Sequence, residues 1–169
     1  MTAIELIHYP APAPLSRWTI RHLDDRGSPT DYQSMVSSGK KLAESARSKR
    51  RSGDNPGAVT DYTRAEAAYT LEGDKGGRAY CLRHRGDILR ELGQTTEGEI
   101  RLREAERLYR QLDDPLGLAN TLRCLALMRD DIAATALWLE ARLLYQSLGV
   151  EAGIAEADCH LVSHSRASE

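Results

Sequence analysis

Phenylalanine is absent from this chain of 169 residues, and aromatic residues make up only 5% of it. The core must therefore be built from Leu, Ala, Ile and Tyr, with two Trp. No stretch approaches the roughly 18 consecutive apolar residues that a membrane-spanning helix needs. The net charge of −2 gives no overall attraction to nucleic acid or to an anionic membrane.

Cysteine is scarce as well. Cys81, Cys124 and Cys159 fall in helical patterns and form no CxxC pair, which excludes a disulfide framework and favours reduced thiols. The first residues lack a basic segment followed by an apolar run, so we expect no secretory signal. These features predict a cytoplasmic protein with a single helical domain.

An internal repeat organises most of the sequence. Four residue positions recur with the same two steps, first of 40 and then of 36 residues, as the step from Tyr69 to Tyr109 to Tyr145 illustrates. The other recurring sets are Ala65, Ala105 and Ala141; Gly77, Gly117 and Gly153; and Ala79, Ala119 and Ala155. Shared offsets at independent positions indicate a repeated structural unit.

The repeated residues resemble the tetratricopeptide repeat, whose signature is W-x2-L-G-x2-Y in one helix and A-x3-F-x2-A in the next. The middle unit matches best, with Leu82, Gly86 and Leu89 in its first helix and Gly98, Leu102 and Ala105 in its second. It departs at Arg85, which replaces the first motif Leu. The first unit departs at Ser45 and Lys49, where apolar residues are expected. The long period is similar to that of repeats in bacterial regulators and signalling scaffolds.

The resemblance implies an all-α fold, a right-handed α-solenoid of antiparallel helix pairs with three hairpins and a C-terminal capping helix. We expect units at 31–72, 76–112 and 116–148, and a final helix at 152–165. The predicted helices span 33–51, 57–72, 77–92, 97–112, 116–129, 132–148 and 152–165. A proline-containing arm at 1–30, partly extended, precedes this domain, and a tail at 166–169 follows it.

Local signals set several of these boundaries. Thr96 and Glu99 have capping-box spacing before the fourth helix. Asp114 followed by Pro115 is typical of a cap and a first helical residue. Gly93 and Gly149 stand where a left-handed residue ends a helix.

No constellation of residues indicates catalysis. The sequence has neither a phosphate-binding GxxxxGK[ST] motif nor an HExxH zinc motif. His160 and His164 have metal-capable spacing, but we interpret them as solvated residues of a terminal helix. Cys81 and His84 share a helical face, and we interpret them as a core thiol beside a surface histidine. We therefore predict no enzyme activity, no metal site and no cofactor.

A partly basic face is the candidate for binding. In this family, the first helix of each pair lines the concave surface. The helical register places on that face Lys40, Arg47, Arg50, Tyr80, Arg83, Asp87, Arg90, Asn120 and Arg123. Counting Asp130 and Glu156 there too, six basic residues accompany three acidic ones. We interpret the face as a groove for a peptide that carries acidic groups or a C-terminal carboxylate, because Arg binds carboxylates through two parallel hydrogen bonds. By the resemblance, Asn120 would hold the peptide backbone.

Three alternatives remain open at this point. The charges can be an ordinary solvated face. The chain can be a self-associating module, a homodimer formed through its open last helix. Nucleic-acid binding through residues 40–51 ranks lowest, because that basic run is short and has no interleaved aromatic residues.

Overall fold

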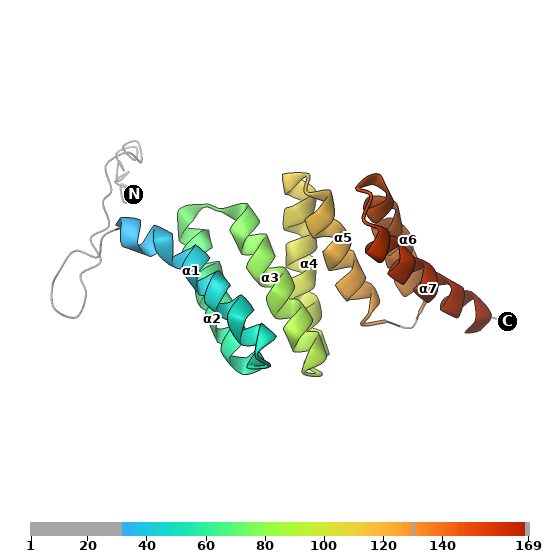
Figure 1. Ribbon diagram of the computed structural model, residues 1–169, viewed down its shortest axis with the longest axis horizontal. Coiled ribbons are helices and arrows are strands. Elements are labelled where there is room, and N and C mark those ends of the chain that lie inside the picture. Colours follow the sequence, from blue (N-terminus) through green and yellow to red (C-terminus); the bar gives the residue numbers. More distant parts are fainter. Residues whose placement is uncertain (1–31, 130, 168–169) are drawn as a thin grey trace, which may run out of the picture. The chain divides into compact units, whose positions relative to one another are not determined.

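We describe the fold from a computed structural model, in which residues 32–129 and 131–167 are described, without the side chains of 32–38 and 164–167. This part of the chain is entirely helical, which confirms the all-α prediction (Figure 1). Its helices are α1 (Tyr32–Arg51), α2 (Asn55–Glu72), α3 (Lys75–Glu91), α4 (Thr95–Leu112), α5 (Pro115–Ala126), α6 (Ile132–Ser147) and α7 (Glu151–Ala167). The arm predicted at 1–30 lies outside the described residues. The predicted tail begins two residues too early, because α7 continues to Ala167.

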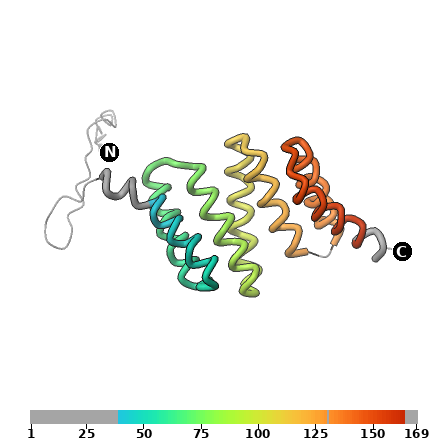
Figure 2. The backbone as a smooth tube through the Cα atoms, viewed as in Figure 1, coloured from blue at the N-terminus to red at the C-terminus, as the bar shows by residue number. Residues whose placement is uncertain are grey.

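The helices pack in chain order. Each contacts the next, and α3 also contacts both α1 and α5. The chain reverses direction at each turn between consecutive helices (Figure 2). Each of the helices α2 to α6 therefore packs against both the preceding and the following helix.

Aspartates begin most of the helices. Asp114 precedes Pro115 and accepts a hydrogen bond from the Gly117 amide at 2.9 Å, which confirms the predicted cap of α5. The equivalent bonds run to Asp54 from Gly57, to Asp74 from Gly77 and to Asp131 from Ala134. Such a bond satisfies one of the amides that a helix leaves open at its start.

Most predicted helix ends agree with the structure within two residues, but one predicted cap and one predicted helix end are wrong. The capping box at Thr96 is wrong: Thr96 lies inside the first turn of α4, and the residue before the helix, Gln94, makes no side-chain cap. Helix α5 ends at Ala126, three residues earlier than expected, and the following residues form a turn. Gly93 and Gly149 have φ of 76° and 67°, as predicted for residues just past a helix end.

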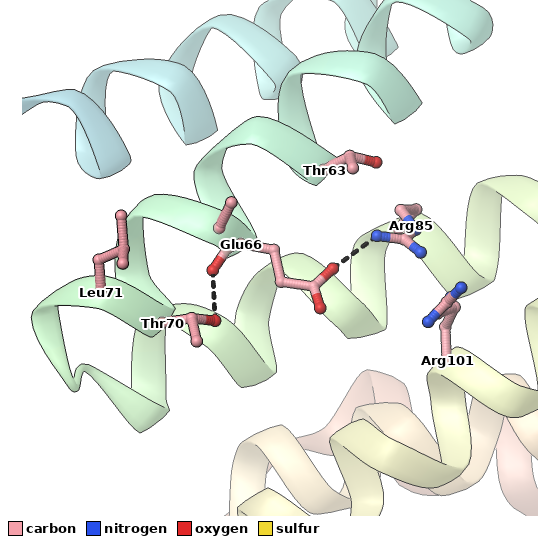
Figure 3. A pocket seen from close by; sticks show the side chains of 7 residues that line it. Thr63, Glu66, Thr70, Leu71, Arg85 and Arg101 are labelled. Carbon is pink, nitrogen blue, oxygen red and sulfur yellow. Dashed lines mark hydrogen bonds and ion pairs between the residues drawn. The ribbon is translucent and has the colours of Figure 1, made fainter. Parts of the chain in front are cut away.

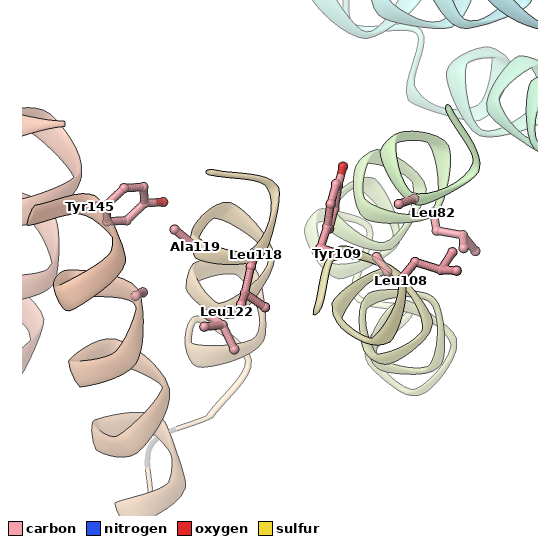
Figure 4. Packing of buried hydrophobic residues seen from close by; sticks show 10 residues of the cluster. Leu82, Leu108, Tyr109, Leu118, Ala119, Leu122 and Tyr145 are labelled. Carbon is pink, nitrogen blue, oxygen red and sulfur yellow. The ribbon is translucent and has the colours of Figure 1, made fainter. Parts of the chain in front are cut away.

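The recurring alanines and glycines allow helices to approach closely. Ala65, Ala105 and Ala141 are fully buried. A Cβ atom on Gly86 would stand 2.9 Å from the Gly98 carbonyl oxygen, so α3 and α4 meet backbone to backbone there. Around the junction of the second and third units, buried side chains of α3, α4, α5 and α6 form one cluster, including Leu82, Tyr109, Leu118, Leu122 and Tyr145 (Figure 4).

The weak match of the first unit has a structural cause. Asp61 of α2 is buried, and its carboxylate accepts a hydrogen bond from the Ser45 hydroxyl at 2.7 Å and pairs with Lys49 at 2.7 Å. The hydrogen bonds from Lys49 and Ser45 lower the pKa of Asp61 and keep it ionised. The polar residues of α1 therefore fill apolar motif positions because they face a buried carboxylate.

Candidate functional site

A cavity of about 280 Å³ opens between α1 and α3, and we call it the α1–α3 cavity. Its lining residues come from three helices and are Lys40, Ala43, Glu44, Arg47, Tyr69, Gly77 and Tyr80. A Cβ atom on Gly77 would lie 2.5 Å from the Tyr69 ring, so only glycine lets this ring lie flat against α3. The cavity thus has a tyrosine wall and a polar rim on α1.

The rim of the cavity has an excess of positive charge. Lys40 and Arg47 are exposed, and Glu44 is the acidic residue of the lining. Within 32–129 and 131–167, neither Lys40 nor Arg47 has an ion-pair partner. These two cations are therefore available to a ligand, whereas most other predicted groove cations are not.

His84 lies next to the α1–α3 cavity and contacts its tyrosine wall as well as two arginines. Its ring stacks on Tyr62 with centroids 5.3 Å apart and meets Tyr80 edge-on at 4.3 Å. Arg50 approaches its Nδ1 at 3.2 Å, and Arg83 approaches its Nε2 at 2.8 Å. Burial, together with the charges of these two arginines, lowers the pKa of His84 to about 3, so the ring is neutral at pH 7. The expected surface histidine is instead a half-buried, stacked one.

Arg50, Asp87 and Arg90 form an ion-pair network at the other end of α3. Arg50 Nη2 lies 2.6 Å from Asp87 Oδ2 and 2.8 Å from Glu91 Oε1. Arg90 donates to Asp87 Oδ1 from Nε and Nη2, at 3.1 and 2.9 Å. Burial raises the pKa of Asp87, but the hydrogen bond and charge of Arg50 outweigh it, and the net pKa is lowered. Both arginines are therefore already neutralised within the protein.

The remaining predicted residues lie in the third unit. Asn120 accepts a hydrogen bond from the Tyr145 hydroxyl at 3.0 Å, which uses its amide oxygen in packing. Arg123 Nε lies 2.7 Å from Glu156 Oε2 of α7. Asp130 falls outside the described residues. The nine predicted residues are thus separated: Lys40, Arg47 and Tyr80 share one cavity, Arg83 stands beside Tyr80 with its guanidinium 5.8 Å from the ring centroid, and five lie in polar contacts elsewhere.

Sequence reasoning missed four residues that shape this surface: Glu44, Tyr69, His84 and Glu91. Glu44 and Glu91 carried a usable signal, since each lies one helical turn from a predicted residue. Tyr69 was recognised only as a packing residue of the repeat. The contacts of His84 join helices that are distant in sequence, so no local pattern announces them.

Two of the three thiols, Cys81 and Cys124, are buried. Burial raises the pKa of Cys81 and of Cys124 to about 12, so both are protonated at pH 7, and Cys159 is exposed. No group of three potential metal ligands occurs among the described residues. His160 stacks on Trp138 with centroids 4.3 Å apart, while the side chain of His164 lies outside the described part.

Neither the known protein-family models nor the curated protein sequences match this chain. Across the described helices, none has the length and apolar character needed to cross a membrane.

Proposed function

We propose that this chain is a cytoplasmic protein–protein interaction scaffold that binds a peptide along the α1–α3 face and has no catalytic role of its own. The observation that carries the proposal is the α1–α3 cavity, in which two unpaired cations, Lys40 and Arg47, border a wall of two tyrosines. A concave, partly aromatic surface with a few placed charges is the usual form of a binding site.

The proposed architecture is a right-handed solenoid of tetratricopeptide type. Contacts between the first helices of successive units, α1 with α3 and α3 with α5, support it, because in such a stack these helices line the inner face. The recurrence of Tyr–Gly contacts between successive units supports it too. In this arrangement Lys40, Arg47 and Tyr80 would lie inside the groove.

The chemistry of the cavity favours an acidic peptide. Lys40 and Arg47 outnumber Glu44, so the lining has one net positive charge, and Arg83 adds another nearby. A guanidinium accommodates a carboxylate through two hydrogen bonds, and each charge-assisted bond is worth about 1.5–3 kcal/mol. Asp or Glu side chains and a C-terminal carboxylate are the expected anchors.

The test is calorimetric titration of a peptide that ends in several acidic residues, with a free C-terminal carboxylate. Replacing Arg47 by Glu should weaken binding at least about ten-fold, since it removes an attractive charge and adds a repulsive one. Arg107→Glu is the matched control: Arg107 is exposed on α4, without an ion-pair partner among the described residues. Equal affinities of the two variants would contradict the groove assignment.

One observation favours self-association as a second candidate function. Ile132, Leu139 and Leu143 are 88%, 49% and 62% exposed and share one face of α6. In the repeat register, Leu139 and Leu143 stand where α4 has Arg103 and Arg107. Three exposed aliphatic side chains in a row are typical of a protein contact surface.

Light scattering over a range of concentrations distinguishes this candidate. The double variant Leu139→Arg and Leu143→Arg restores the charged pattern of α4 and should be monomeric where the unaltered chain is dimeric. A monomeric unaltered chain at every concentration would rule out the homodimer. Nucleic-acid binding stays the least favoured function, because Lys49 and Arg50 of the basic run are already paired with acidic residues.

A further inference from the structure

Each repeat unit brings together one position on its first helix and one on its second. The three pairs are Ser45 with Asp61, Arg85 with Arg101, and Leu125 with Leu137. The first-helix positions are 40 residues apart at both steps, and the second-helix positions follow the steps of 40 and then 36 residues. The equivalent positions are thus occupied by a hydroxyl and a carboxylate in the first unit, by two guanidiniums in the second, and by two aliphatic side chains in the third.

In two of these units, the paired side chains make favourable contacts within the protein. In the first unit, the Ser45 hydroxyl donates to the Asp61 carboxylate at 2.7 Å. In the third unit, Leu125 is fully buried, and Leu137 packs against the apolar cluster that contains it. One unit therefore uses a hydrogen bond and the other apolar contact.

The middle unit instead places two guanidiniums together. Arg85 is buried, and burial lowers its pKa, yet it donates to Glu66 Oε2 at 2.5 Å and remains a cation. The Nε atom of Arg101 is buried and has no hydrogen-bond partner. Glu97 lies near both but binds neither tightly, at 3.8 Å from Arg85 and 3.4 Å from Arg101. Charge-assisted bonds are normally 2.7–2.9 Å long.

A pocket of about 470 Å³ opens at this arginine pair. It is bordered by α2 with Thr63, Glu66, Ala67, Thr70 and Leu71, by α3 with Arg85, and by α4 with Arg101. Figure 3 shows the guanidinium of Arg101 pointing toward Arg85, with the Glu66 carboxylate on the far side of Arg85.

We propose that this pocket is a second binding site, distinct from the α1–α3 cavity, for a monocarboxylate with a short aliphatic body. The carboxylate accepts hydrogen bonds from Arg101 and Arg85, and the aliphatic part lies on Ala67 and Leu71. The carboxylate belongs either to a free organic acid or to the C-terminal residue of a peptide.

The charge of the pocket selects a single negative charge. Two arginines and Glu66 leave the lining with one net positive charge. A monoanion completes that balance, whereas a phosphate dianion would meet repulsion from Glu66 and from Glu97 at the rim. Glu97 is half exposed and can swing into water when the ligand carboxylate takes its place.

Titration of the full chain with isovalerate, followed by NMR of the backbone amides of α2 and α4, tests the site. Amides around Ala67, Leu71 and Arg101 should shift saturably. Isovaleramide, which has the same shape without the charge, should bind at least about ten-fold more weakly, as expected for loss of one charge-assisted interaction. Inorganic phosphate should bind more weakly than isovalerate. Tighter binding of N-acetyl-leucine would identify a peptide terminus as the source, and tighter binding of isovalerate a free acid.

Two variants give opposite expected effects. Arg101→Gln should weaken isovalerate binding about ten-fold, and Glu97→Gln should strengthen it, because Glu97 competes for the same donors. Arg107→Gln, on the same helix and outside the pocket, should change nothing, and neither should Arg47→Glu. Absence of saturable shifts, equal binding of acid and amide, or equal effects of Arg101→Gln and Arg107→Gln would overturn the proposal. Arg47→Glu tests the α1–α3 cavity separately. A negative result for isovalerate binding would therefore not contradict the proposed peptide groove.

Discussion

The ring of Tyr109 lies directly against the α-carbon of Gly117, so a Cβ atom added there would stand 2.2 Å from Tyr109 Cε1. The same contact joins Tyr69 to Gly77 and Tyr145 to Gly153, each at 2.5 Å. In each case a tyrosine ending the second helix of a unit covers the first helix of the next. These three contacts connect consecutive units and explain why Tyr and Gly recur eight residues apart.

Replacing Gly117 by Ala should destabilise the protein by about 1–3 kcal/mol, because the added methyl group displaces a buried ring. The control is Gly76→Ala in α3, where the nearest atom to a new Cβ is Asp74 Oδ1 at 3.4 Å. There the change should be neutral or stabilising by about 0.5–1 kcal/mol, since Ala favours helix. Urea unfolding measures both; equal losses at the two glycines would show that the ring contact is not the cause.

Substitutions at two adjacent aspartates, Asp113 and Asp114, should change the stability of the protein in opposite directions. Asp113 has φ of 51°, and the repeat places Gly73 and Gly149 at the equivalent positions. Asp113→Gly should therefore stabilise the protein, by up to about 1 kcal/mol, because glycine adopts this conformation without strain.

Asp114→Ala removes the carboxylate that accepts from the Gly117 amide and should cost about 1 kcal/mol. Thermal unfolding of the two single variants compares them directly. If both destabilise the protein, the backbone of Asp113 is not the source of strain.

The helices were predictable because their signals are local. Aspartate caps and left-handed glycines fixed several helix ends within two residues. The end of α5 was not predictable, because no Gly or Pro follows Ala126 at once, and the helix stops where the short turn into α6 begins. The capping-box prediction at Thr96 was wrong because the same residue spacing is also compatible with a threonine inside the first turn of a helix.

The free energy of unfolding should depend on pH because the folded protein lowers the pKa of His84. Its folded pKa of about 3 lies below the ordinary value of 6.5, so the unfolded chain binds more protons between these values. The stability associated with neutral His84 is fully present above pH 6.5 and is lost as the pH falls toward 3. The loss is at most about 1.4 kcal/mol per pH unit.

His84→Gln should flatten the stability curve between pH 6.5 and 4 in urea unfolding, because it removes the proton uptake of the unfolded chain at this residue. His160→Gln, at a partly buried histidine stacked on Trp138, is the control. An unchanged slope in His84→Gln would mean that His84 titrates alike in both states.

The binding face was only partly predictable, and for a physical reason. Helical register placed Lys40, Arg47 and Tyr80 on one face, and they do share a cavity. Whether a charge is free depends on partners from other helices, as with Arg50 and Asp87, which lie 37 residues apart. Of the arginine pair in the middle unit, the sequence indicated only Arg85, because it departs from the motif. Arg101 could not be recognised, because its importance depends on its position beside Arg85 in the folded structure.

The polar pair of the first unit should be exchangeable for the apolar pair of the third. Ser45→Leu alone places an aliphatic group against the buried Asp61 carboxylate and removes its hydrogen bond, so it should destabilise the protein by about 1–3 kcal/mol. Asp61→Leu alone leaves the Ser45 hydroxyl facing an apolar side chain and should also destabilise it.

The double variant restores a matched Leu–Leu contact, as in Leu125 and Leu137, and Lys49 is exposed enough to turn into water. Its loss of stability should be smaller than the sum of the two single losses, with a coupling of about 0.5–3 kcal/mol in a double-mutant cycle followed by urea unfolding. Strict additivity would show that the equivalent positions of the three units do not share one packing environment.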